Sequence, residues 1–192
     1  MCLWSRAFIG KTVVYPPDFE WKTKMLRCRH SPIRYLTFSF FLKDVPYWLS
    51  TELSRHHIGV EKYIKSQRDD RNSDDIPRSD KPQGSFVNMI IDFNGESICT
   101  VMNKRLCGCA TREMQQLMLM IRKKVLETNP EFEDFLVPMC IYTTKCREFS
   151  SCELSALYSL VWQESCRTFR SADELPHLPL VFNISYKEKL SF

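Results

Sequence analysis

The sequence predicts an α+β protein, and three observations lead to that class. Residues 35–43, YLTFSFFLK, are rich in aromatic and β-favouring side chains with moderate alternation, as in a strand. The composition is 44% hydrophobic with 13 Phe and only 5 Gly, which indicates a packed globular protein rather than a disordered chain. An apolar stripe at helical spacing consists of Met114, Leu117, Met118, Ile121 and Val125.

The length of the chain and its net charge indicate how many domains to expect and what kind of ligand suits the protein. A chain of 192 residues can form one well-cored domain, which we expect over 1–152, with a C-terminal extension over 153–192. The net charge of +4 is spread along the chain, so it does not indicate nucleic-acid binding but suits a small anionic ligand. Because no apolar run reaches the roughly 18 to 20 residues of a membrane helix, we expect a cytoplasmic protein without a membrane partner.

The remaining elements follow in chain order. Asp44 and Pro46 predict a helix start, with Asp44 as N-cap, and the apolar spacing extends that helix from about 45 into the middle 50s or beyond. Residues 65–85 are a polar connector, and 86–128 form the longest structured region. Asn129 and Pro130 end its helix, and a short helix starts at 131–136.

The C-terminal extension offers two further expectations. Residues 153–164 have the pattern of an amphipathic helix, and 178–192 suit a terminal strand or a subunit-docking arm.

Residues 51–68, TELSRHHIGVEKYIKSQR, form an unusual segment. Arg55, His56 and His57 stand together, and Ser66 and Arg68 follow in the same segment. Such a cluster is either an ordinary solvated helix end or a place where an anion binds, since guanidinium groups pair well with oxyanions.

This segment resembles the signature of the flavin-dependent thymidylate synthase (ThyX) family, which is Arg-His-Arg followed by Ser-x-Arg. Arg55-His56-His57 and Ser66-Gln67-Arg68 occupy those two motifs. Later family motifs follow in register, at Arg78 with Pro82, at Asn94, at Asn103-Lys104-Arg105, and at Ala110 with Glu113. Upstream, HSPIRYLTFSF is similar to the family's His-x-x-Pro-Phe-Glu-His segment, so the resemblance covers roughly residues 27 to 140.

The resemblance implies a single mixed domain with long helices packed on a small antiparallel sheet. It also implies reductive methylation of dUMP to dTMP, with FAD as hydride carrier and with NADPH and methylenetetrahydrofolate as co-substrates. The protein would be a homo-oligomer, expected to be a tetramer whose site is shared between subunits, and nucleic acid would not be a partner.

The same resemblance assigns the site residues. Arg105 would be the catalytic group, stabilising negative charge on the uracil ring, and no protein nucleophile is required because the cofactors carry the redox step. The expected dUMP contacts are Glu52, Leu53, Ser54, Arg55, Ser66, Gln67, Arg68, Arg78 and Arg105. The expected FAD contacts are Ser31, Arg55, His56, His57, Asn94, Glu96 and Thr100.

Four positions depart from the family pattern. Glu52 stands where the family has glutamine, and Thr100 where it has asparagine. His57 and Glu96 each stand where the family has arginine, so His57 replaces a permanent cation by a group that titrates near neutrality. The connector between Ser66 and Arg78 is also shorter than in better-known members.

A cysteine cluster lies outside the shared signature. Cys140, Cys146 and Cys152 recur at intervals of six, and Cys107 and Cys109 precede them. Thiolates bind zinc or iron-sulfur clusters, but usual ligand spacings are shorter, so we expect no metal. Packed thiols or an opportunistic disulfide are the simpler interpretation.

Two alternatives to an active synthase remain. The chain could be a nucleotide-binding or scaffold relative without synthase activity, or an enzyme that modifies another pyrimidine nucleotide.

Overall fold

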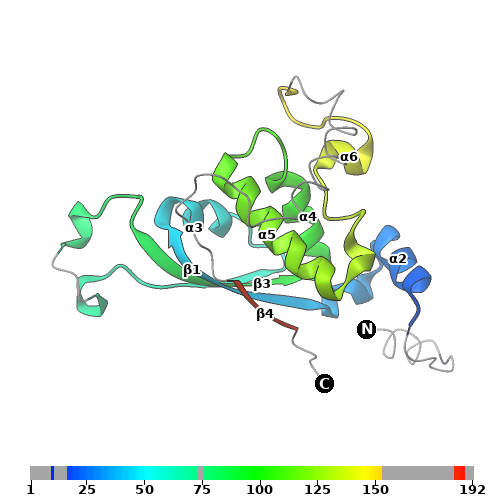
Figure 1. Ribbon diagram of the computed structural model, residues 1–192, viewed down its shortest axis with the longest axis horizontal. Coiled ribbons are helices and arrows are strands. Elements are labelled where there is room, and N and C mark those ends of the chain that lie inside the picture. Colours follow the sequence, from blue (N-terminus) through cyan, green and yellow to red (C-terminus); the bar gives the residue numbers. More distant parts are fainter. Residues whose placement is uncertain (1–9, 11–16, 73–75, 153–183, 189–192) are drawn as a thin grey trace.

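A computed structural model describes residues 10, 17–72, 76–152 and 184–188. The expected helix at 153–164 lies outside the described residues, and of the expected terminal strand only 184–188 are described. A four-stranded antiparallel sheet runs through the molecule in the order β2-β3-β1-β4 (Figure 1). Its strands are β1 (Thr37–Pro46), β2 (Val60–Ile64), β3 (Phe86–Asn94) and β4 (Ile184–Glu188).

Helices lie on one face of the sheet (Figure 1). The α-helices are α2 (Phe19–Arg27), α3 (Tyr47–Ser54), α4 (Gly95–Arg105), α5 (Arg112–Thr128) and α6 (Met139–Thr143). Short 3-10 turns are η1 (Ser31–Tyr35), η2 (Asp69–Arg71), η3 (Arg78–Asp80) and η4 (Pro130–Phe132). Helices plus a small antiparallel sheet confirm the α+β class. In the described part of the chain, no helix combines the length and apolar character needed to cross a membrane.

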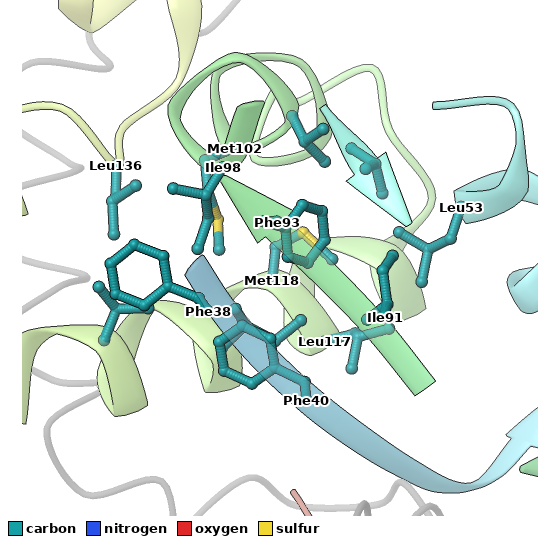
Figure 2. Close-up of a cluster of buried hydrophobic side chains, with 14 of the residues drawn as sticks. Phe38, Phe40, Leu53, Ile91, Phe93, Ile98, Met102, Leu117, Met118 and Leu136 are labelled. Carbon is teal, nitrogen blue, oxygen red and sulfur yellow. The ribbon is translucent and has the colours of Figure 1, made fainter. Parts of the chain in front are cut away.

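The core lies between one face of the sheet and helices α4 and α5. Alternate residues of β1 and β3 point into it, among them Phe38, Phe40, Ile91 and Phe93 (Figure 2). The rings of Phe40 and Phe93 meet edge to face with centroids 6.1 Å apart. All five residues of the predicted α5 stripe are fully buried, which confirms that part of the prediction.

The predicted helix start at Asp44 is wrong. The pairing of β1 with β3 shifts between Leu42 and Val45 and then continues to Pro46, so Asp44 belongs to the strand. Asp44 occupies the left-handed region at φ 55° in this bulge. Helix α3 begins at Tyr47 and ends at Ser54, so His56 lies beyond it.

Two other predicted boundaries also change. The helix that was expected to reach the middle 50s or beyond ends at Ser54, and Val60 begins β2 and is buried. The short helix expected at 131–136 is only the 3-10 turn η4. Of the polar connector over 65–85, the described residues 65–72 and 76–85 are mostly exposed, and Figure 1 shows them extending away from the helices.

Candidate functional site

The site is built along helix α4, against which the chain leaving α3 folds back. Asn94 caps α4 by accepting hydrogen bonds from the backbone of Glu96 (3.0 Å) and Ser97 (2.8 Å). The carbonyl of Gly59 accepts from Asn94 N (3.1 Å) and Ser97 Oγ (2.6 Å). Gly59 has φ +68°, and a Cβ there would lie 2.3 Å from Asn94 Nδ2, so only glycine allows this close approach.

At the other end of α4, Arg105 meets two residues from the α3 region. Its Nε donates to His56 Nε2 (2.7 Å), and its Nη1 pairs with Glu52 Oε1 (2.5 Å). Its Nη2 donates to the Glu52 carbonyl (3.2 Å). The side chains of Glu52 and Arg105 are each only 18% exposed, so water screens the ion pair incompletely. We call these three residues the Arg105 cluster.

Histidine 56 is neutral in the cluster. Burial lowers the pKa of His56 to about 4, with further lowering by the charges of Arg105, Lys62 and His57. Because Nε2 accepts from Arg105, the ring proton resides on Nδ1. The guanidinium is therefore balanced by one carboxylate and oriented by an uncharged ring.

The other expected nucleotide contacts occupy two further places. Arg55 is exposed just after α3, and its guanidinium has no hydrogen-bond or ion-pair partner among the described residues. Leu53 is fully buried in the core, so its side chain is not available to a ligand. Ser54 Oγ donates to the Ser50 carbonyl (2.7 Å) within α3.

Ser66, Gln67, Arg68 and Arg78 belong to the connector. Arg68 Nε pairs with Asp70 (2.9 Å), and its backbone N donates to Ser66 Oγ (3.2 Å). The backbone N of Arg78 donates to Asp69 Oδ1 (2.8 Å), which brings the two arginine-bearing turns together. Within the part of the chain that the structure describes, no hydrogen bond or ion pair joins this group to the Arg105 cluster.

Three of the expected flavin residues, Asn94, Glu96 and Thr100, lie at the start of α4 or within it. Glu96 pairs with Arg34 (2.5 Å), Thr100 Oγ1 donates to the Glu96 carbonyl (3.1 Å), and Ser31 is exposed in η1. Leu36 O accepts from Gly95 N (2.8 Å), so the chain leaving η1 is held against α4.

Arg34 was not identified from the sequence. Its pairing with Glu96 spans 62 positions, and no local pattern marks so distant a contact. The guanidinium of Arg34 offsets the negative charge that Glu96 places where the family has arginine.

Arg55 and His57, two of the expected flavin contacts, lie in one exposed turn after α3. Both side chains are exposed, and Arg55 offers a rigid donor fork that pairs with phosphate oxygens. His57 Nδ1 lies 3.1 Å from the Arg55 carbonyl, which holds the two residues in one turn. Glu96 does not fit as a phosphate contact, because its carboxylate repels anions and is already engaged by Arg34.

The cysteine cluster carries only thiols. The described cysteines are all free, so the alternative of a disulfide among them is not observed. Burial raises the pKa of Cys107 to about 11 and also raises that of Cys140, which keeps both protonated near neutrality. In the described ranges, no three His, Cys, Asp or Glu side chains are grouped as a metal ion would require.

Comparison with models of known protein families and with curated proteins found no match in either case.

Proposed function

We propose that this protein methylates dUMP reductively to dTMP, using methylenetetrahydrofolate, FAD and NADPH. The observation that carries the proposal is the 2.7 Å contact between Arg105 Nε and His56 Nε2. It joins two motifs of the family resemblance that lie 49 positions apart in the sequence. A coincidental match of short motifs provides no reason for these particular side chains to meet.

Arg105 is suited to the uracil ring. Attack by uracil C5 requires negative charge to develop on the ring oxygens and N3, and a fixed guanidinium beside them stabilises that charge. Losing one such preorganised donor costs about 3 kcal/mol of activation free energy. Neutral His56 contributes by orienting the guanidinium without adding a competing charge.

Glu52 limits which atoms of the pyrimidine ring can face the Arg105 cluster. Its Oε1 is bound to Arg105, while Oε2 contacts only the Thr111 hydroxyl at 3.5 Å among the described residues. An N–H of the pyrimidine ring can donate to this second oxygen while a ring carbonyl accepts from Arg105. A phosphate has only acceptors and would be repelled by the carboxylate.

The phosphate therefore belongs with the other arginines. Arg55 is exposed and has no described partner, and Arg68 and Arg78 share the connector with Ser66. A dianionic ester relieves the mutual repulsion of several guanidinium groups. Arg55 and His57 would hold FAD, which would supply the hydride.

The test is a turnover assay with purified protein, dUMP, methylenetetrahydrofolate, FAD and NADPH. We expect a yellow protein whose flavin absorbance is bleached by NADPH, and dTMP as the product. Lys104→Ala is a matched control, because Lys104 is the exposed neighbour of Arg105 and pairs with Glu148. The proposal fails if dTMP is absent with every component supplied, or if Arg105→Ala is as active as Lys104→Ala.

One observation favours a second candidate, a nucleotide-binding relative without synthase activity. The ion pair between Glu52 and Arg105 already satisfies the guanidinium that the chemistry would use. A protein of this kind would bind dUMP but would neither retain flavin nor form dTMP. Equilibrium dialysis with dUMP and with FAD separates the two candidates.

A further inference from the structure

Lys62 is a cation on the core-facing side of edge strand β2. Burial alternates along this strand, so Lys62 shares the side that faces the helices with buried Val60 and half-buried Ile64. Its cross-strand partner on β3 is Ile91, whose side chain is fully buried. Because removal from water disfavours a charged group, a half-buried ammonium at this position requires a specific partner.

The partner of Lys62 is the turn that carries His56. Lys62 Nζ donates a 2.7 Å hydrogen bond to the His56 carbonyl, across six positions of the chain. The His56 N–H donates to the Leu53 carbonyl (3.0 Å), so both backbone polar groups of His56 are bound. Among the described residues Lys62 has no carboxylate partner, so its charge is not neutralised and acts on its surroundings.

The charged groups around the His56 ring favour its uncharged form. Burial lowers the pKa of His56 most strongly, and the pKa is about 4 in the folded chain. The positive charges of Arg105 on α4, Lys62 on β2 and His57 in the same turn lower it further. Glu52 on α3 is the carboxylate of the cluster, and it is bound to Arg105. Only an uncharged ring can accept the hydrogen bond from Arg105 Nε, because a protonated ring has two donors and no acceptor.

We propose that Lys62 is a positioning residue for Arg105 and acts through His56. Its hydrogen bond holds the His56 backbone against β2, and its charge favours the ring form that accepts from Arg105 Nε. This positioning is a property of the protein without ligand, whereas its effect on a bound uracil ring rests on the proposed function. A lysine on an edge strand can instead serve only to prevent pairing with another chain, a role that requires no effect on His56.

The first test follows the His56 ring by nuclear magnetic resonance. Lys62→Met keeps the length of the side chain but removes the charge and the donor, so we expect the pKa of His56 to rise by about half a unit, roughly threefold in proton affinity. Lys62→Arg keeps both properties and should leave the value close to that of wild type. Lys65→Met is the matched control, because Lys65 is exposed and its charge is not among those that act on His56.

Two results overturn the proposal, namely an unchanged His56 pKa in Lys62→Met and an equal rise in Lys65→Met. The first of these is the result expected of a lysine that only protects the edge of the sheet. Lys62→Gln should raise the pKa likewise, because it also lacks the charge. Since its side chain is polar, the comparison does not depend on the solubility of the methionine variant.

The second test examines Arg105 directly. A poorly fixed acceptor should speed the exchange of the Arg105 Nε proton with water, so we expect faster exchange in Lys62→Met than in Lys62→Arg. Equal exchange rates in these two variants contradict positioning through His56.

Turnover separates this inference from the proposed function. In a protein that forms dTMP, Lys62→Met should lower kcat about tenfold with little change in KM, since a displaced guanidinium stabilises the transition state less. On acidification its rate should fall at a higher pH than that of wild type, because His56 gains its proton there, and Lys62→Arg should restore most of the rate. A wild-type protein that forms no dTMP refutes the proposed function, whereas the titration of the His56 ring still decides the role of Lys62.

Discussion

Arg105 depends on its neighbours, because every nitrogen of its guanidinium has a partner in the structure. Glu52 holds the two Nη atoms through its carboxylate and its carbonyl, and His56 holds Nε. This arrangement fixes the direction of the cation before any ligand arrives. Preorganisation of this kind is what electrostatic catalysis requires.

Substituting Arg105 should show how strongly the Glu52–Arg105 interaction contributes to the free energy of unfolding. Arg105→Ala leaves the Glu52 carboxylate partly buried without its cation, so we expect the free energy of unfolding to fall by about 1 to 2 kcal/mol. Adding Glu52→Gln to that variant should recover part of the loss, because the unpaired charge is gone. Urea denaturation of both single variants and the double variant measures the coupling. Strictly additive effects would contradict a direct Glu52–Arg105 interaction.

Histidine 56 should make stability depend on pH in one window. The folded chain holds its pKa at about 4, whereas an unfolded histidine titrates near 6.5, so only the unfolded state gains a proton between those values. The stabilising effect of a neutral His56 is thus fully present above pH 6.5 and is lost as the pH falls toward 4. We expect a loss on the order of 2 kcal/mol, after allowance for partial solvent screening.

Denaturation at pH 7 and pH 4.5 measures this loss. In His56→Gln the amide oxygen still accepts from Arg105, but the titrating group is absent, so the decrease should be smaller than in wild type. His30→Gln is the control, because His30 is exposed and its charge is not among those that act on His56, so this variant should keep the wild-type pH dependence. Equal pH dependence in His56→Gln and wild type would exclude His56 as its source.

Among the elements, α4 positions the site because its two ends hold different groups. Asn94 caps its start beside Gly59, and Arg105 closes its other end beside α3. The left-handed turn at Gly59 therefore directs the chain that leaves α3 back alongside α4.

Gly59→Ala should disturb that turn. The new methyl group would require both a strained backbone and movement of Asn94, so we expect a loss of about 2 kcal/mol in unfolding free energy. Gly84→Ala is the control, since a Cβ at Gly84 has no atom within 4 Å and should change stability little. Thermal unfolding of the two variants distinguishes them, and equal melting temperatures would show that the turn is not constrained.

Elements with a regular apolar repeat were predicted better from the sequence than elements whose boundaries rest on a single residue type. The α5 stripe was predicted correctly because Met114 to Val125 keeps one face buried over several turns. The start of α3 was misplaced because an aspartate before Val-Pro resembles an N-cap, whereas the β1–β3 ladder continues past Asp44. Tertiary pairing overrode the local signal there.

The site was predictable to a smaller extent. Motif order assigned His56 to the flavin and Arg105 to the nucleotide, and the structure shows that the two side chains are in contact. Motif order carried no information on which carboxylate would neutralise which cation. The pairings of Glu52 with Arg105 and of Glu96 with Arg34 depend on how α3, η1 and α4 pack.

At the scale of the whole molecule, the arginines expected to bind the nucleotide do not form one described group, and Arg55 lies just after α3. Arg105 lies in the half-buried cluster, whereas Arg68 and Arg78 lie in the exposed connector. If dUMP bridges such groups, its affinity should weaken as salt is raised, because charge pairs exposed to water are screened. Isothermal titration of dUMP at low and high ionic strength measures the effect, with deoxyuridine as the uncharged control. An affinity for dUMP that is indifferent to salt would argue against a phosphate bound by arginine.

In the proposed function, Arg105 and His56 mark the site where uracil C5 becomes nucleophilic. The most direct measurement is tritium release from dUMP labelled at C5, with methylenetetrahydrofolate, FAD and NADPH supplied. We predict release that follows dTMP formation in wild type and falls by about a hundredfold in Arg105→Ala, the loss expected for a preorganised donor. Absence of tritium release from a folded wild-type protein that binds both dUMP and FAD would contradict the claim.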